Sequence, residues 1–206
     1  MKRIMLLALP LWLAACFTAC SLPGPAPSVI QHDLGGSFPS GSVKSPVALR
    51  TIQVSAQPLV ASSAMQYREA SQPTRRGVYA LNRWATTPAA MVEAALIRQL
   101  APDGSGRCRL QLSLGEFIID VEANGKARAV LAADATLLRD AVVSGTTTNA
   151  TISTPASTSR QGFDISVPMN EPGPAAGALA LREAVHQLAE GTASWLAGEP
   201  GRMCNL

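Results

Sequence analysis

Hydrophobic and polar residues alternate with strand spacing in several stretches of this sequence. The alternation is most regular over residues 108–114 (CRLQLSL), where every second residue is apolar. A period of two residues is typical of a strand that buries one of its faces. Shorter runs rich in β-branched or aromatic residues predict further strands at 29–34, 47–54, 65–68, 78–81 and 163–167.

The stretch Lys126–Asp140 supports two interpretations. Its apolar residues alternate strictly, which favours a strand, whereas its many alanines favour a helix. The dipeptide Asn124-Gly125 comes just before it and follows the apolar stretch Leu110–Glu122. Because Asn-Gly is a preferred hairpin turn, the pattern favours two long strands joined by this turn.

Two helices are predicted from apolar residues spaced three and four apart. The first begins at Thr87-Pro88, a capping residue followed by proline in the first helical position, and ends before Pro102. The second follows Pro174 and carries its apolar stripe over residues 178–195. An amphipathic helix of this length is expected to lie on the sheet.

The order of these elements predicts the fold class. No internal repeat and no second apolar core is visible. We therefore expect one α/β (α+β) domain over residues 47–198, with a mostly antiparallel sheet packed by two main helices, one of them the long C-terminal helix. Residues 199–206 are expected to form a C-terminal tail. Part of the segment 142–174, rich in Ser, Thr and Gly, is expected to be a mobile loop.

The first fifteen residues have the pattern of an export signal. Lys2 and Arg3 precede the apolar run Ile4–Leu13. That run is too short to span a bilayer, because a membrane-spanning helix needs about 20 residues. Residues 1–15 are therefore predicted to be a signal peptide that is removed.

Two cysteines follow this run. The sequence Leu13-Ala14-Ala15-Cys16 resembles the bacterial lipobox, in which the cysteine is lipidated before the leader is cut off. Cys20 is a second match, weakened by Phe17 in place of a branched aliphatic residue. We expect lipidation at Cys16, with Cys20 as the alternative, and a permanent membrane anchor, since each buried CH₂ contributes roughly 0.8 kcal/mol. The other interpretation is an ordinary secreted protein in which these cysteines form a disulfide or stay free.

A linker separates the predicted anchor from the predicted domain. Of the 26 residues from Ser21 to Pro46, 15 are Pro, Gly or Ser, a composition typical of linkers. Residues 16–46 are therefore predicted to be a tether, with one possible short strand near 29–34.

Composition and charge exclude nucleic-acid binding. Aromatic residues make up only 4% of the chain, too few for base stacking. Removal of Lys2 and Arg3 with the leader lowers the formal net charge from +3 to +1. A nearly neutral surface does not suit recognition of phosphates.

We expect no enzymatic activity, metal or cofactor. The chain has no Gly-rich phosphate loop, no G-x-S-x-G elbow and no paired-carboxylate motif. Its two histidines, His32 and His186, have no Cys or His neighbours at zinc-ligand spacing. His186 falls on the polar side of the C-terminal helix, where we expect it to be solvated.

Two cysteines remain within the domain. In an oxidising compartment Cys108 and Cys204 are candidates for a disulfide that would fasten the C-terminus to the sheet. The alternatives are two buried thiols, or a frayed tail in which Cys204 has no partner.

Motifs in the first half of the chain resemble a known family. Tyr67-Arg68, then residues 78–85 (VYALNRWA) and Pro88, resemble the Y-R and Y-x-x-N-R-W-A-x-x-P motifs of the ABC-type transport auxiliary lipoproteins, the PqiC/YmbA-like family. Residues 110–117 (LQLSLGEF) resemble the L-x-L-x-x-x-E-F strand of that family, and the C-terminal helix resembles its closing helix. His32-Asp33-Leu34-Gly35 resembles the Y-D-L-G strand of the family, with histidine replacing the aromatic residue.

This resemblance implies a function and a set of partner-binding residues. Members work with an MCE-domain protein and an ABC permease and ATPase that move phospholipids or other lipids between membranes. The resemblance also implies that Lys126–Asp140 is a strand. The partner-binding candidates that it implies are Arg68, Asn82, Arg83 and Trp84. For Trp84 a role in the core stays open beside an interface role, and Arg83 is equally suited to capping carbonyls or to pairing with an acidic partner.

The expected location is the outer membrane, lipid-anchored and facing the periplasm, because no Asp follows Cys16 or Cys20. A homo-oligomer is possible. Two other functions stay open: a carrier that holds a lipid between sheet and C-terminal helix, and a structural envelope lipoprotein with no transporter partner.

Overall fold

The structure is a computed structural model that describes residues 27–36, 38, 41–140 and 157–205. The predicted signal peptide, both lipidation candidates (Cys16 and Cys20) and residues 141–156 of the predicted mobile loop lie outside the described residues.

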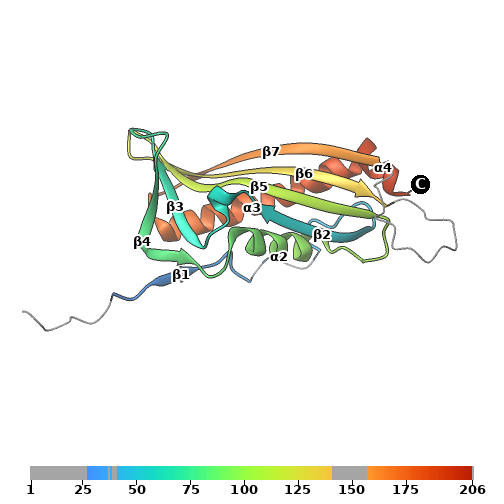
Figure 1. Ribbon diagram of the computed structural model, residues 1–206, viewed down its shortest axis with the longest axis horizontal. Helices are drawn as coiled ribbons and strands as arrows, with labels where there is room; N and C mark the ends of the chain where they lie inside the picture. The colour runs from blue at the N-terminus through green and yellow to red at the C-terminus, as the bar shows by residue number, and fades with distance from the viewer. Residues whose placement is uncertain (1–26, 37, 39–40, 141–156, 206) are drawn as a thin grey trace, which may run out of the picture.

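One seven-stranded sheet forms the body of the molecule (Figure 1). Six strands lie in the order β1-β4-β3-β5-β6-β7, and β2 pairs with β5 outside this path. The strands are β1 (Ile30–His32), β2 (Leu49–Ala56), β3 (Ala64–Glu69), β4 (Arg76–Trp84), β5 (Cys108–Val121), β6 (Ala127–Arg139) and β7 (Ser157–Met169).

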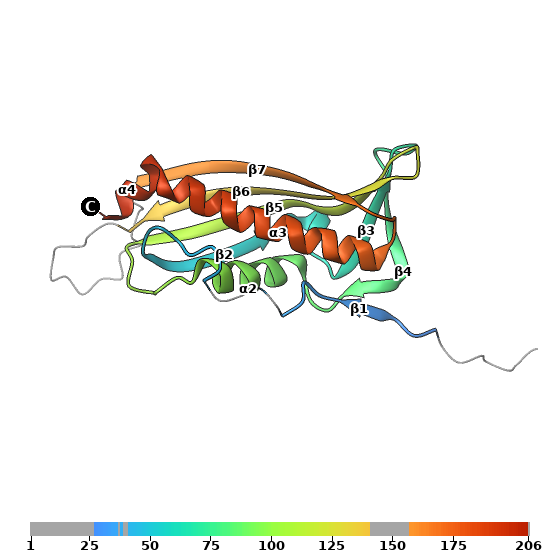
Figure 2. The same ribbon diagram turned by 180° about the vertical axis from the view of Figure 1, so that it is seen from behind.

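The helices are α2 (Pro88–Leu100), α3 (Pro174–Ala197) and α4 (Glu199–Asn205), and a short 3-10 turn, η1 (Pro58–Val60), joins β2 to β3. α2 and α3 lie on the same face of the sheet, with α3 along its full length (Figure 2). The predicted fold class, an α+β domain with a long C-terminal helix, is confirmed.

Strand directions are mixed. The three longest strands, β5, β6 and β7, are antiparallel, as are β3 and β4. Three shorter pairings are parallel: β1 pairs with β4, β2 pairs with the first half of β5, and β3 pairs with the last residues of β5. Sequence alternation had not predicted these parallel pairings.

The hairpin expected at Asn124-Gly125 is present. The Gly125 N–H donates to the Glu122 carbonyl, the Glu122 N–H donates to the Lys126 carbonyl, and Gly125 has φ of 80°. Glycine adopts this conformation without steric cost. The stretch Lys126–Asp140 thus continues into β6 and is a strand rather than a helix.

The core lies between the sheet and the helices. Four of the six alternate residues on the buried face of β6 are alanines (Ala127, Ala129, Ala133 and Ala135), and the other two are Leu131 and Leu137. The alanines let the helix approach the sheet closely. Helix α3 also approaches β5 closely at Gly177, where a Cβ would overlap the Ile119 side chain. The alanines of β6 therefore reflect the packing of α3 on this strand, and the segment itself does not form a helix.

Helix α2 begins as predicted. The Thr87 Oγ1 accepts a hydrogen bond from the Ala90 N–H at 3.4 Å, and Pro88 occupies the first turn. The helix ends at Leu100, followed by Ala101 in a left-handed conformation with φ of 46°.

Elements of the structure also lie outside the predicted domain 47–198. The possible short strand near 29–34 is present as β1, which joins the sheet, and the side chains of Leu34 and Phe38 are buried in the core. The predicted tail 199–206 contains α4, whose Cys204 is also buried. At both ends a few apolar side chains hold the chain against the body.

Candidate functional site

The family-like motifs of the first half lie on the neighbouring strands β3 and β4 near the β1 edge of the sheet, with Arg68 beside the start of β4 and residues 82–84 at its end. Arg68 lies on β3, and Asn82, Arg83 and Trp84 close β4. The short strand β1 pairs with β4 at these last three residues, so the chain enters the domain beside them.

Trp84 belongs to the core. Its side chain is 1% exposed and meets the Phe117 ring edge-on, with 5.3 Å between centroids. The backbone N–H of Trp84 donates to the Ser63 carbonyl at 2.8 Å. The indole does not lie on the surface of the domain, so the prediction of Trp84 as a partner-binding residue is corrected: its side chain packs between sheet and helices.

Asn82 fastens β1 to β4. Its Oδ1 lies 2.8 Å from the Nε2 of His32, the residue that replaces an aromatic in the family-like pattern. The imidazole thus binds the neighbouring strand by a hydrogen bond. Arg83 is exposed, and its Nη2 donates to the Ser63 Oγ at 3.1 Å. Of the residues that close β4, Arg83 presents a charged group to solvent.

Arg68 lies in a charged cluster on the sheet face opposite the helices. Its guanidinium makes two hydrogen bonds to Asp120, at 2.9 and 3.1 Å, and a third to Glu116 at 3.5 Å. The hydrogen bond to Asp120 raises the pKa of Arg68, against the opposing effect of burial. Arg76 binds Glu116 at 2.7 Å, and Arg128 lies 3.7 Å from Asp120. Arg68 therefore has carboxylate partners within the domain.

Sequence reasoning missed most of this cluster. Arg76 and Arg128 lie outside the motifs, and Asp120 becomes a partner of Arg68 only because β3 pairs in parallel with the end of β5. The register Arg68↔Asp120 places the two side chains on the same face. Charged residues at alternate positions of a strand indicate a polar face. The sequence did not show which strand lies beside β3, so the partner of Arg68 could not be found.

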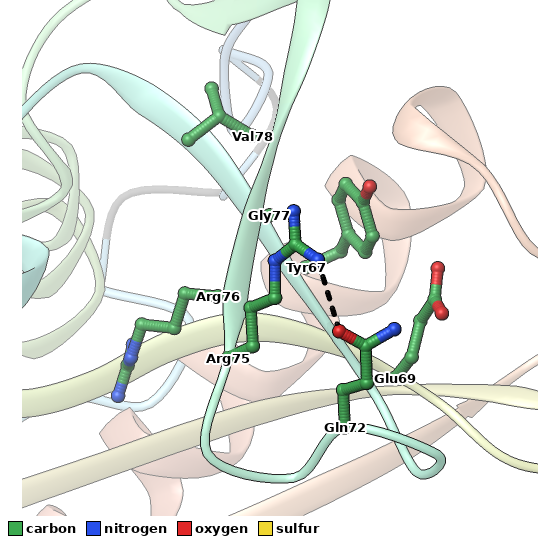
Figure 3. Close-up of a pocket in the computed structure, with 7 residues that line it drawn as sticks. All are labelled: Tyr67, Glu69, Gln72, Arg75, Arg76, Gly77 and Val78. Carbon is green, nitrogen blue, oxygen red and sulfur yellow. Dashed lines mark hydrogen bonds between the residues drawn. The ribbon is translucent and has the colours of Figure 1, made fainter.

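A polar cavity of about 400 Å³ lies at the β3–β4 turn (Figure 3). Tyr67 lies over Gly77, where a Cβ would overlap the phenol ring, and Arg75 Nη1 binds Gln72 Oε1 at 3.0 Å. In the same view Arg76 points to the other side of β4 from Tyr67. The Tyr67 ring also contacts Tyr79, with 4.8 Å between centroids, and burial raises the pKa of the Tyr79 phenol.

Exposed apolar side chains follow the same edge. Val78 and Leu81 on β4 and Val29 and Ile30 at β1 are each between 44% and 55% exposed. The β1–β4 register places Val29 beside Leu81. We call these four residues the apolar edge. A cluster of large exposed apolar residues is typical of an interaction surface.

The two remaining sequence candidates are also placed. Cys108 and Cys204 form a disulfide with an S–S distance of 2.08 Å, which confirms that prediction. His186 is not simply solvated: its Nδ1 lies 2.6 Å from Oε1 of the fully buried Gln99, so it connects α3 to α2. The helical spacing had placed His186 on the polar side of the helix, and the buried polar partner on α2 was not visible in the sequence.

Within residues 27–36, 38, 41–140 and 157–205, the structure contains no cluster of three or more His, Cys, Asp or Glu side chains suited to a metal ion. In the same ranges no helix has both the length and the apolar character needed to cross a bilayer.

Comparison with known proteins identifies the fold. A crystal structure of a DUF330 protein from Xanthomonas campestris matches 82% of this chain and 92% of its own length, with a TM-score of 0.57 and 20% identity. An uncharacterized protein matches 82% of this chain and 99% of its own, with a TM-score of 0.59 and 14% identity. The chain has the fold of these two proteins.

Other comparisons add less. A candidate lipoprotein from Caulobacter crescentus overlaps 54% of this chain and 84% of its own at 19% identity, and its TM-score of 0.31 does not establish a common fold. No model of a known protein family matches the sequence, and no curated protein matches it.

Proposed function

We propose that this protein is a lipid-anchored periplasmic lipoprotein that acts as an auxiliary component of an MCE-type ABC transporter for lipids. The observation that carries the proposal is the position of the family-like residues 82–84, which pair with β1, the strand through which the predicted tether enters the domain. Its role is to dock onto the transporter rather than to catalyse a reaction.

The family resemblance and the fold support this role together. DUF330, the designation of the Xanthomonas campestris protein, denotes the PqiC/YmbA-like family whose motifs this sequence resembles. The leader with its lipobox-like Cys16 supports the anchor. The absence of Asp after Cys16 and Cys20 favours the outer membrane.

We assign docking of the MCE-domain protein to the apolar edge. Val78 and Leu81 supply exposed apolar area, and Arg83 adds a cation at its border. An exposed apolar patch with a polar or charged residue at its rim is typical of a protein–protein interaction site. β1 belongs to this edge and follows the predicted tether in the chain. The tether would therefore join the domain next to the docking surface.

A lipid carrier is the second candidate, and the core argues against it. A carrier needs a cavity between the sheet and α3. In the described chain that layer holds side chains that are fully buried or nearly so, such as Leu131, Leu181 and Leu188. Helix and sheet are in contact across these residues, so a lipid would have to displace them.

The test is affinity purification of the tagged full-length protein from crosslinked membranes, with mass spectrometry of proteins and lipids. We expect an MCE-domain protein or its permease to be recovered. Leu81→Asp should reduce that recovery about tenfold, because binding would bury an unpaired carboxylate in an apolar contact. Leu179→Asp, a substitution of another exposed leucine that lies on α3, is the matched control and should leave recovery unchanged.

Recovery of phospholipid without any transporter component would contradict the auxiliary role and favour the carrier. Equal recovery of the transporter with both variants would contradict the placement of the docking surface.

A further inference from the structure

Strand β7 forms one edge of the sheet along thirteen residues. It pairs with β6 on one side, and no described strand pairs with the other. Both views draw it at the rim of the sheet (Figures 1 and 2). A long edge strand presents unpaired N–H and C=O groups that can accept another strand.

The hydrogen-bond pattern shows which backbone groups point outward. The Glu122 N–H donates to the Lys126 carbonyl, so even-numbered residues of β6 face β5 and odd-numbered ones face β7. The β6–β7 register pairs odd residues with odd residues, as in Ala129↔Val167. The outward backbone groups of β7 therefore belong to its even-numbered residues: Thr158, Arg160, Gly162, Asp164 and Ser166.

Opposite charges lie symmetrically about the centre of this row. Arg160 and Asp164 each lie two residues from Gly162, and all three are exposed. The two charged side chains are four residues apart, roughly 13 Å along the strand, so they cannot pair with each other. Among the described residues neither takes part in an ion pair.

We propose that β7 pairs antiparallel with β7 of a second copy of this chain, about a two-fold axis at Gly162. In that register Arg160 of each copy lies opposite Asp164 of the other, so two ion pairs form at once. In a two-fold interface, if residue 160 of one copy contacts residue 164 of the other, the reverse contact forms as well. One arginine and one aspartate in each copy are therefore enough for two ion pairs. Gly162 has no side chain to crowd the axis; its carbonyl accepts a hydrogen bond from the exposed Gln161 Nε2 at 2.9 Å, which the partner strand would replace.

Other registers of the same strands are less favourable. A shift of the axis to residue 161 would place Arg160 opposite Gly162, and a shift to residue 163 would place Asp164 opposite Gly162. Both lose the two charge pairs. Pro168 ends the row of donors, because proline lacks an N–H, and this limits the ladder to residues 158–166. Charge thus specifies one register among several that the backbone allows.

The interface is expected to be small and therefore weak in solution. A few paired residues bury less than the roughly 1,200 Å² typical of stable complexes. Copies held by anchors in one membrane meet at a high effective concentration, which favours pairing. The inference does not depend on the transporter role, because it uses only β7.

Cysteine crosslinking of the full-length protein in membranes tests the register. Two Gly162 Cα atoms in a hydrogen-bonded pair would be about 5.5 Å apart, within disulfide range. A Cβ at Gly162 makes only an ordinary contact of 3.6 Å with Asp134 Oδ1, so Gly162→Cys should fold. We expect Gly162→Cys to give a crosslinked dimer above the wild-type background.

Ser166→Cys is the matched control on the same face of the same strand. In the proposed register it faces Thr158 of the other copy and lies roughly 26 Å from its own counterpart, so no dimer should form. Absence of a dimer with Gly162→Cys, or equal yields from both variants, would overturn the proposal, as would crosslinking of residue 162 only to another protein.

Charge reversal in the Gly162→Cys background tests the ion pairs. Arg160→Glu or Asp164→Arg alone places like charges opposite each other at two sites, and each should lower the dimer yield at least about fivefold. The double variant restores opposite charges and should restore the yield. Unchanged yields in the single variants, or no recovery in the double variant with an unchanged thermal midpoint, would contradict the proposal.

Discussion

Trp84 and Arg83 are neighbours in β4 whose side chains serve different purposes. The indole lies against Phe117 in the core, whereas the guanidinium is exposed and donates to the Ser63 hydroxyl. Adjacent residues of a strand point to opposite faces, which separates the two roles. Within this motif, Trp84 therefore stabilises the fold, and Arg83 contributes to the surface.

Truncation of Trp84 should destabilise the domain. Trp84→Ala removes a side chain that is 1% exposed, and such changes cost about 3–5 kcal/mol of unfolding free energy. Arg83→Ala should change that free energy by less than about 0.5 kcal/mol. Denaturant unfolding of the two variants measures the difference. Equal effects would contradict the core placement of the indole.

Ionisation of the Tyr79 phenol should make the stability of the domain depend on pH. Burial raises the pKa of its phenol above the usual value near 10, and the nearby Tyr67 adds to the shift. Because the folded state favours the neutral phenol, this contribution to stability is complete below pH 10 and is lost as the pH rises through the folded-state pKa.

The chain has two tyrosines, so Tyr67→Phe leaves Tyr79 as the single reporter. A pH titration of phenolate absorbance in this variant should give a midpoint above that of the unfolded chain in denaturant. Coincident midpoints would show that the Tyr79 phenol is not buried.

At the scale of the elements, local patterns predicted which segments are strands and helices. Thr87-Pro88 predicted the start of α2, and Asn124-Gly125 predicted the β5–β6 hairpin. These signals are local, because turn and cap chemistry depends on residues close in sequence. The alanines of β6 were ambiguous, since their purpose, close packing of α3, depends on another element.

The neighbours of each strand could not be predicted in this way. Alternation tells which face of a strand is buried and says nothing of the strand beside it. The pairing of β3 with β5, which joins Arg68 to Asp120, depends on contacts between residues 52 positions apart. For the same reason the candidate site was predicted in part: the motif residues were found and a core role for Trp84 was one of two interpretations, but the carboxylate partners of Arg68 were not found.

The Cys108–Cys204 disulfide should stabilise the domain by holding α4 against the start of β5. It joins residues 96 positions apart. Loss of such a crosslink costs about 2–4 kcal/mol. Cys204→Ser should lower the free energy of unfolding by that amount in denaturant titrations. Adding a reductant should destabilise the wild type equally and have no further effect on the variant; an effect on the variant would contradict this account.

A side-chain hydrogen bond holds β1 in addition to its backbone pairing. His32→Ala removes the bond to Asn82 and should cost about 0.5–1.5 kcal/mol, expressed locally because β1 is only three residues long. Hydrogen exchange of the amides in β1 and of Ala85, whose N–H donates to the His32 carbonyl, should accelerate. Unchanged exchange there would show that the backbone ladder alone holds β1.

At the scale of the whole molecule, the first and last described elements lie far apart. β1 lies at one end of the elongated domain, and α4 with its disulfide lies at the other (Figure 1). The apolar edge is next to β1, so docking surface and predicted tether share one end. This arrangement suits a protein that is anchored in one membrane and meets a partner extending toward it.

The central claim is that the apolar edge contacts an MCE-domain protein. Its most direct test is a photo-crosslinking amino acid placed at Val78 in the full-length protein in cells, with the same residue at Leu179 as the control. The account predicts a crosslink from position 78 to an MCE-domain protein and none from position 179. A crosslink from position 179 alone, or crosslinks from position 78 only to lipid, would contradict it.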